Sequence, residues 1–313
     1  AKEFGVTSNG RYSDVYEDLV AYLRTIDTPL VILDEAGDLQ YEAFLELKAL
    51  WNATERCCAW YMMGADGLKE KINRAIEGNK PGPLTVEYYR QRATAGLIIA
   101  EASPISPLAQ GYLDTPGIWS AEQVAAWREV TSAVHGEGGK IVLQLWHVGR
   151  ISHSSLLPDG AAPVSSTDRV ANASTFTREG FIPVSKPRAL RDDEIPALIE
   201  DYRRAARNAI DAGFDGVEIH AANTYLIEQF LRDSVNDRSG PYGGSIANRA
   251  RLLLEVVAAI AGEIGAGRTG IRLSPMTTFT APLDSDPQAL YGYVVEQLAP
   301  FGLAYLHVIE GET

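Results

Sequence analysis

The chain has 313 residues, of which 46% are hydrophobic and 22% are charged, as in an ordinary globular protein. Its net charge of −13 argues against a nucleic-acid partner, because such binding depends on Lys and Arg that neutralise phosphates. The two cysteines, Cys57 and Cys58, are adjacent, and no apolar run approaches the roughly 20 residues that span a bilayer. We therefore expect a cytoplasmic protein that binds neither nucleic acid nor membrane.

The first 80 residues alternate predicted helices with predicted strands at 29–36 and 57–65. In PLVILDEAGDL, Asp34 and Glu35 occupy the positions of a Walker B carboxylate pair, so residues 1–80 resemble a fragment of a transposition-type AAA+ ATPase. The chain contains no G-x-x-x-x-G-K-[ST] phosphate loop, so we expect no ATP hydrolysis. The Gly- and Pro-rich stretch EGNKPGPLT predicts a domain boundary near residue 80, which makes the chain chimeric.

Residues 81–313 alternate short apolar segments with amphipathic ones. The predicted strands are 96–102, 140–147, 215–221, 269–275 and 303–310. The predicted helices are 120–138, 191–213, 248–267 and 286–302. Three of the four helices end in Gly close to the next strand, as helix C-caps do. This alternation predicts a parallel sheet, either doubly wound or closed as a (β/α) barrel.

Residues 150–190 form the longest segment without helical periodicity. They are rich in Ser, Thr and Pro but carry scattered Val, Phe and Leu. A segment of this length in a compact domain is usually a lid or disordered, and the apolar residues favour a packed lid.

Polar and aromatic side chains recur near the ends of three predicted strands. Because residues two apart share a strand face, Gln144 lies with Trp146 and Glu218 with His220, while Arg272 faces away from its apolar neighbours. Taken singly, each is more often a core residue, and a strand Arg more often pairs with a carboxylate such as Glu218. Parallel barrels place their catalytic groups at the carboxyl ends of strands, so the recurrence makes an active site as good an interpretation as a core role.

Several longer motifs carry a family resemblance over residues 83–310. They are EYYRQRATAGLIIAEASPIS, GYLDTPGIWSAEQVAAWREVT, LQLWHVGRISHSS, the run from KPRAL to EQFL that contains HAANTY, YGGSIANRARLLLEV, and GIRLSP. Together they are similar to the old yellow enzyme family, the NADH:flavin oxidoreductases that include N-ethylmaleimide reductase-like ene reductases. The resemblance implies an α/β fold with an incomplete (β/α)8 TIM barrel of five recognisable strands. It also implies an enzyme that uses FMN, with NADPH or NADH as reductant, to reduce activated C=C bonds of α,β-unsaturated carbonyl or nitro compounds.

The resemblance also implies which residues contact the flavin. The backbone at Ala102, which ends a strand, would touch the pyrimidine and N5 edge. Gln144 would hydrogen-bond the isoalloxazine, and Arg272 would lie near the N1 and O2 edge, where a positive charge stabilises the reduced, anionic flavin.

The substrate site is implied by HAANTY and two aromatic residues. His220 and Asn223 would donate to the carbonyl or nitro oxygen, on which negative charge builds as hydride reaches the β-carbon. Tyr225 would donate the proton to the α-carbon, since a phenol with a pKa near 10 is protonated at neutral pH. Tyr112 and Trp146 would line the pocket. The alternative for Tyr225 is a residue packed in the core of a helix.

The sequence also departs from the family pattern. Thr224 stands where the family usually has Gly, which is unfavourable if the backbone there needs a positive φ. We find no counterpart of the family's first strand or of its last two, whose loops hold the FMN phosphate. About three charge-assisted hydrogen bonds would be lost, and FMN would bind about three to six powers of ten more weakly.

Two other functions stay open. The first is a cofactor-free, inactive scaffold, and the second is a nucleotide-dependent accessory protein of DNA transposition. A metal site is not expected, because the five histidines include no H-E-x-x-H motif and no close Cys/His cluster.

Overall fold

The computed structural model describes residues 30–33, 59–62 and 79–309. The chain divides into two compact units, Ala1–Arg74 and Ala75–Thr313. Among the described residues, no helix combines the length and the apolar character needed to cross a membrane.

The first unit contains two described strands, β1 (Leu30–Leu33) and β2 (Ala59–Met62). They pair in parallel as a two-stranded sheet, and both lie inside the predicted strand ranges. The Walker B-like residues Asp34 and Glu35 lie outside the described residues.

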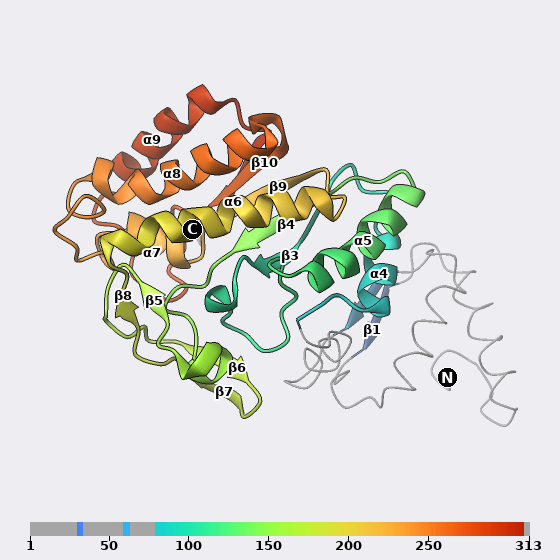
Figure 1. The fold of residues 1–313 in the computed structure, drawn as a ribbon, viewed down its shortest axis with the longest axis horizontal. Helices are drawn as coiled ribbons and strands as arrows, with labels where there is room; N and C mark the ends of the chain where they lie inside the picture. Colours follow the sequence, from blue (N-terminus) through green and yellow to red (C-terminus); the bar gives the residue numbers. More distant parts are fainter. Residues whose placement is uncertain (1–29, 34–58, 63–78, 310–313) are drawn as a thin grey trace, which may run out of the picture. The chain divides into compact units, whose positions relative to one another are not determined.

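The second unit is built on a five-stranded parallel sheet. Its strands are β3 (Ile98–Pro104), β4 (Ile141–Trp146), β9 (Gly216–Ala221), β10 (Thr269–Leu273) and β11 (Tyr305–Val308). All five strand predictions are confirmed. Each strand pairs in parallel with the next of these five along the chain, which is the strand order of a (β/α) barrel rather than of a doubly wound sheet (Figure 1).

Helices join the strands and cover the sheet. The α-helices are α4 (Pro83–Arg90), α5 (Ala121–Gly136), α6 (Ile195–Asp211), α7 (Leu226–Leu231), α8 (Ile246–Ile264) and α9 (Pro287–Leu298). Short 3-10 helices are η3 (Pro107–Ala109), η4 (Ser154–Leu156), η5 (Pro158–Gly160), η6 (Asp192–Glu194), η7 (Ala266–Arg268) and η8 (Ala299–Phe301). The four helix predictions are confirmed as α5, α6, α8 and α9, which pack one against the next along the sheet (Figure 1).

Local sequence sets where these helices begin and end. The side chains of Ser120, Ser245 and Asp286 accept a hydrogen bond from the backbone N–H three residues on, at the starts of α5, α8 and α9. Gly213 follows α6 with φ 88° and Gly265 follows α8 with φ 91°, in the region that glycine occupies without strain. These residues therefore fix where each helix begins and where the chain turns towards the next strand.

Residues 150–190 are packed and contain strands that the sequence did not predict. β5 (Val164–Ser165) pairs with β8 (Arg188–Ala189), and β6 (Ser174–Thr177) forms an antiparallel hairpin with β7 (Gly180–Pro183). The prediction of a packed segment is confirmed. The strands were missed because they are two to four residues long, too short for a periodic pattern.

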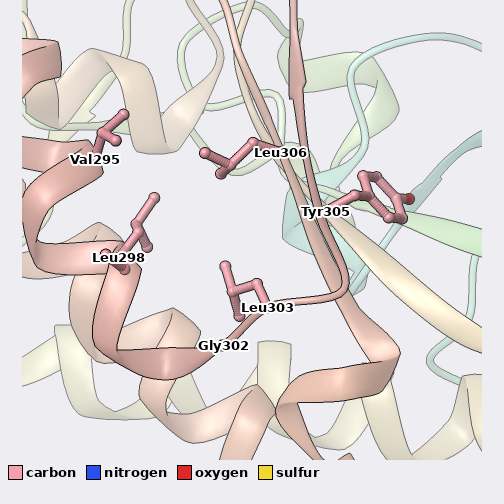
Figure 2. A pocket seen from close by; sticks show the side chains of 7 residues that line it. Val295, Leu298, Gly302, Leu303, Tyr305 and Leu306 are labelled. Atoms are coloured by element: carbon pink, nitrogen blue, oxygen red, sulfur yellow. The ribbon is translucent and has the colours of Figure 1, made fainter.

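Burial differs between the middle of the sheet and its last strand. Every residue of β4 and β9 is buried, whereas β11 alternates half-buried with exposed residues. Beside β11 lies an apolar groove in which side chains of α9 face those of β11 and of the segment before it (Figure 2). It is lined by Val295, Leu298, Ala299, Gly302, Leu303, Tyr305 and Leu306.

Candidate active site

Strand register arranges inward side chains of the sheet in two rows. The lower row joins Ala102, Gln144, Glu218, Gly270 and Tyr305, each in register with the next. A Cβ on Gly270 would lie 2.3 Å from the Tyr305 ring, so glycine is needed for that ring to cross the row.

The upper row lies two residues further along each strand, at the carboxyl end. It joins Pro104 with Trp146, and His220 with Arg272 and His307; the Trp146 and His220 rings lie 6.2 Å apart. The polar residues predicted near the ends of three strands are therefore brought together on one face of the sheet, at two adjacent heights rather than one.

A β-bulge sets the position of Ala102. The register of β3 against β4 shifts between Ile99 and Ala102. Within the bulge, the backbone N–H of Glu101 donates to Tyr89 Oη at 2.8 Å instead of to a strand. Bulges re-aim the chain next to active sites, and this one brings Ala102 level with Gln144.

Glu218 is fully buried and organises the lower row. Gln144 Nε2 donates to Glu218 Oε1 at 2.6 Å, and His307 Nδ1 lies 3.0 Å from Glu218 Oε2. The amide of Gln144 is thereby oriented, and its carbonyl oxygen receives no hydrogen bond from the described residues. The alternative that Arg272 pairs with Glu218 is wrong: among described residues, the Arg272 guanidinium makes no ion pair, and its buried Nε has no partner.

Three aromatic rings and one imidazole form a cluster above these rows. Tyr112 stacks on Trp146 with 5.5 Å between ring centroids and 13° between planes. Tyr225 meets Trp146 edge-on at 4.9 Å and His220 edge-on at 5.1 Å. The hydroxyls of Tyr112 and Tyr225 are 3.2 Å apart. The structure thus brings four of the predicted site residues into direct contact.

His220 is a neutral imidazole whose tautomer follows from its contacts. Burial, then the charge of Arg272 and His307, lowers the pKa of His220 to about 3. Its Nδ1 accepts the backbone N–H of Ala222 at 3.3 Å, so the ring proton lies on Nε2. Nε2 donates to none of the described residues and is available to a bound acceptor.

The surroundings of Tyr225 favour its neutral, protonated form. Burial, followed by the nearby Tyr112, raises the pKa of Tyr225 far above its usual value. Burial likewise raises the pKa of Tyr112. Tyr225 stands at the N-cap of α7 with extended backbone and is buried in a small hydrophobic cluster with Trp146 and Val148. The alternative of a packed residue at the start of a helix therefore stays open beside the catalytic role.

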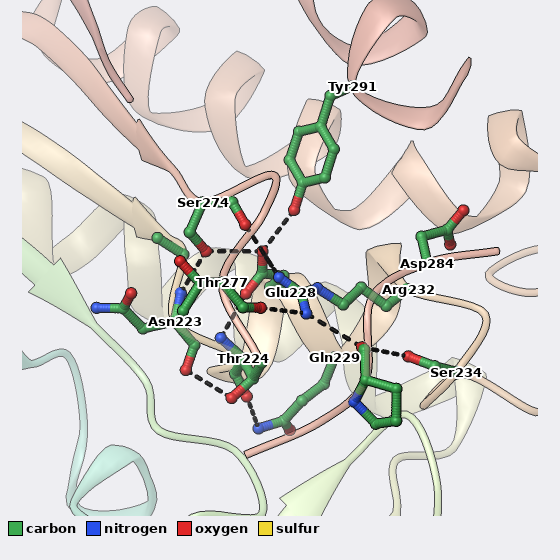
Figure 3. A network of polar contacts seen from close by, with 12 residues as sticks. Asn223, Thr224, Glu228, Gln229, Arg232, Ser234, Ser274, Thr277, Asp284 and Tyr291 are labelled. Carbon is green, nitrogen blue, oxygen red and sulfur yellow. Dashed lines mark hydrogen bonds and ion pairs between the residues drawn. The ribbon is translucent and has the colours of Figure 1, made fainter. Parts of the chain in front are cut away.

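The turn between His220 and Tyr225 carries two left-handed residues. Asn223 has φ 56° and Thr224 has φ 59°. The backbone therefore does need a positive φ at Thr224, where the β-branched side chain costs about 1–2 kcal/mol. Asn223 is half-buried, and its side chain points away from the polar network beneath it (Figure 3). No hydrogen bond joins its amide group to His220 among the described contacts.

These groups suit a planar ring with polar edges, which is the flavin of FMN. Near these two rows, four atoms have no hydrogen-bond partner among the described residues: Arg272 Nε, Trp146 Nε1, His220 Nε2 and the carbonyl oxygen of Gln144. They include a fixed positive charge and an acceptor, which match the anionic N1 and O2 edge and a ring N–H. In the same described part, no three His, Cys, Asp or Glu side chains come close enough to hold a metal ion.

Comparison with known proteins agrees with the fold and identifies a family. The family model described as "NADH:flavin oxidoreductase / NADH oxidase family" matches residues 71–311, which is more than half of the sequence. The chain belongs to this family. The predicted resemblance to old yellow enzymes over residues 83–310 is confirmed, and the AAA+ resemblance of residues 1–80 stays a prediction.

Individual relatives are similar over most of the chain. A putative 12-oxophytodienoate reductase 4 of Oryza sativa subsp. japonica is 52% identical over 259 residues, covering 80% of this chain and 67% of its own. A structure of morphinone reductase in complex with tetrahydroNAD shows 50% identity and a TM-score of 0.72, covering 75% of this chain and 66% of its own. The structure of the old yellow enzyme homologue from Zymomonas mobilis shows 45% identity and a TM-score of 0.73, covering 75% of this chain and 66% of its own. The chain thus spans about two thirds of the length of these relatives.

Sequence reasoning missed residues that hold the site residues in place by hydrogen bonds. Glu218 was considered only as a partner of Arg272, whereas its contact with His307 joins residues 89 positions apart in the sequence. Glu228 and Ser274, which hold the Asn223 turn, were not identified. The only sequence signal for Glu228 is its spacing of four residues from Arg232, which helices often use for ordinary surface pairs.

Proposed function

We propose that this chain carries the catalytic part of an FMN-dependent ene reductase, which uses NADPH or NADH to reduce the C=C bond of α,β-unsaturated carbonyl or nitro compounds. The observation that carries the proposal is the neutral His220, with Nε2–H unpaired among the described residues, in edge-on contact with the protonated Tyr225. When bound, FMN supplies the hydride that goes to the substrate β-carbon. FMN is the cofactor that the family description implies.

Three residues would hold and tune the flavin. The Gln144 amide, oriented by Glu218, presents its carbonyl oxygen to a ring N–H. Arg272 places an unneutralised positive charge beside the site, where it favours negative charge on the ring. The backbone at Ala102, in register with Gln144, would contact the ring edge.

The remaining residues would act on the substrate. His220 Nε2–H and the Asn223 amide would donate to the activating oxygen, and these bonds strengthen as negative charge builds there. The Tyr225 hydroxyl would then give its proton to the α-carbon. Because burial disfavours a phenolate, only a strongly basic carbon takes this proton, and a water molecule in the site does not. Tyr112 and Trp146 would wall the pocket as a stacked pair.

The test is the visible absorption of the purified protein before and after addition of FMN. We expect a flavin band that bleaches with NADPH and recovers with 2-cyclohexenone. The Tyr225→Phe variant should bleach normally but recover about 10²–10⁴ times more slowly, the usual contribution of a general acid. Tyr202→Phe is a matched control, since Tyr202 is a fully buried tyrosine in α6. A protein that takes up no FMN would instead support the inactive scaffold.

We propose a related substrate range, on the ground that relatives are named for 12-oxophytodienoate and morphinone. Turnover of each compound by the FMN-loaded protein, compared with 2-cyclohexenone, tests this range.

For residues 1–80 we keep the proposal of an AAA+ ATPase-like fragment joined to the barrel, supported by PLVILDEAGDL alone. Mass spectrometry of the protein in its source cells would show whether one polypeptide contains both parts. A cytoplasmic location without nucleic-acid partners is proposed from the acidic charge and the adjacent cysteines. Cell fractionation and filter binding to DNA test these two statements.

A further inference from the structure

The turn at Asn223 and Thr224 requires an outside constraint. Two consecutive non-glycine residues adopt positive φ there, 56° and 59°. Such a conformation persists only where surrounding contacts over-determine it. The contacts of this turn therefore decide where its side chains stand.

Both backbone amides of the turn are tied to one carboxylate (Figure 3). The N–H of Thr224 donates directly to Glu228 Oε2. The N–H of Asn223 donates to Ser274 Oγ at 2.7 Å, and the Ser274 hydroxyl donates to Glu228 Oε1 at 2.8 Å. Glu228 thus fixes two successive peptide groups, one of them through a serine at the end of β10.

The carboxylate is itself held in place. Glu228 and Arg232 are fully buried, and Arg232 Nη2 lies 2.9 Å from Glu228 Oε1. The Tyr291 hydroxyl of α9 donates to the same oxygen at 2.5 Å, and burial, followed by the Glu228 charge, raises the pKa of Tyr291 so that it stays a donor. Arg232 also donates to the backbone oxygens of Ser274 and Thr277, which anchors the segment after β10 (Figure 3).

We infer that Glu228 is a positioning residue of the proposed active site: its carboxylate fixes the turn at Asn223 and Thr224, and thereby the direction of the Asn223 side chain, whose amide is proposed to bind the substrate oxygen. This inference rests on the proposed function. Buried ion pairs are weak stabilisers, because desolvation offsets their attraction, so conformational specificity is the better account of this one.

The mildest test is Ser274→Ala, which removes only the hydroxyl between the Asn223 amide and Glu228. In the protein without flavin, we expect hydrogen exchange at the Asn223 amide to become about tenfold faster, as for the loss of one ordinary hydrogen bond. Exchange in β4 should not change. An unchanged Asn223 rate overturns the inference, whether or not the protein binds FMN.

Ser152→Ala is the matched control. Ser152 is equally buried, and its hydroxyl donates to the backbone oxygen of Gln110 at 2.7 Å, away from the Glu228 contacts. The control should leave exchange at Asn223 unchanged. An equal acceleration in Ser152→Ala would mean general loosening and would overturn the inference.

The functional test uses Glu228→Gln in the FMN-loaded protein. We expect kcat for 2-cyclohexenone to fall about tenfold or more, while NADPH bleaches the flavin at the normal rate, because the turn serves the substrate oxygen. Adding Thr224→Gly, which adopts positive φ without strain, should restore part of the loss. A purely structural role would instead slow flavin reduction and substrate reduction together.

If Glu228→Gln does not fold, Tyr291→Phe replaces it, because this change keeps the Glu228–Arg232 pair and removes one donor. Its expected signature is the same split, with slower substrate reduction and normal flavin reduction. Equal slowing of both half-reactions would contradict the inference. Failure to bind FMN would count against the proposed function alone, because the exchange test needs no flavin.

Discussion

The middle of the sheet and its last strand are built from similar residues but are buried differently. Ile219 of β9, Ile271 of β10 and Leu306 of β11 lie in one row by strand register, yet Ile219 and Ile271 are fully buried and Leu306 is 43% exposed. In the next row His220 is buried, whereas the His307 side chain is 34% exposed. The candidate site lies on the buried strands, where fixed polar groups act in a medium of low dielectric.

The largest expected effect separates the two histidines of one row. His220→Phe should slow 2-cyclohexenone reduction about 10²–10³-fold, the usual effect of losing one donor to a developing oxyanion. His307→Phe should slow it less than about tenfold, because His307 contacts Glu218 and not the substrate oxygen. Single-turnover kinetics of flavin reoxidation measure both. Equal losses would contradict the assignment of the donor to His220.

A second comparison concerns the row of apolar side chains formed by Ile219, Ile271 and Leu306. Ile219→Ala should lower the free energy of unfolding by about 2–5 kcal/mol, because it leaves a cavity in the core. Leu306→Ala should cost less than about 1.5 kcal/mol, since Leu306 is already 43% exposed to water. Urea denaturation of the full chain, monitored by tryptophan fluorescence, measures the free energy of unfolding of both variants. A similar cost at both positions would show that another part of the protein covers the groove of Figure 2 in solution.

Acid should destabilise the fold by protonating two buried histidines. Burial lowers the pKa of both His147 and His220 to about 3. In the unfolded chain both titrate near 6.5, so the unfolded state binds more protons and stability falls as pH drops from about 6.5 towards 3. Each histidine lowers the free energy of unfolding by about 2 kcal/mol when the pH falls to 5.

The matched variant for this effect is His147→Asn, whose side-chain oxygen can accept the Gly149 N–H that Nδ1 now accepts. Its melting temperature should decline less between pH 7 and pH 5 than that of the parent. His153→Asn, which changes a histidine outside the buried core, should follow the parent curve. A His147→Asn curve parallel to the parent would argue against a buried neutral His147.

The smallest effect compares two left-handed positions. Thr224 is buried beside the site with φ 59°, and Gly302 precedes β11 with φ 64° and open space around its Cβ position. Thr224→Gly should be more stable than Thr224→Ala by about 1–2 kcal/mol, and Gly302→Ala should cost about 1 kcal/mol. Thermal unfolding of the three variants measures both differences. If Thr224→Ala equalled Thr224→Gly, the positive φ would not be retained in solution.

Much of the fold was predictable because it depends on local patterns. The helix α5 follows from its apolar spacing and from Ser120 at its start, and the five strands follow from short apolar runs between turn residues. The hairpin of β6 and β7 was not predictable, because its strands gain stability from packing against the rest of the barrel rather than from their own sequence.

By itself, the sequence determined which side chains share a strand face, because the alternation of a strand has a fixed period of two. It therefore placed Gln144 with Trp146 and Glu218 with His220. Only the tertiary structure decided which of these groups meet: Glu218 contacts Gln144 and His307, and not Arg272. The physical reason is register, since the relative shift of strands that are distant in sequence depends on the bulge in β3 and on packing across the sheet.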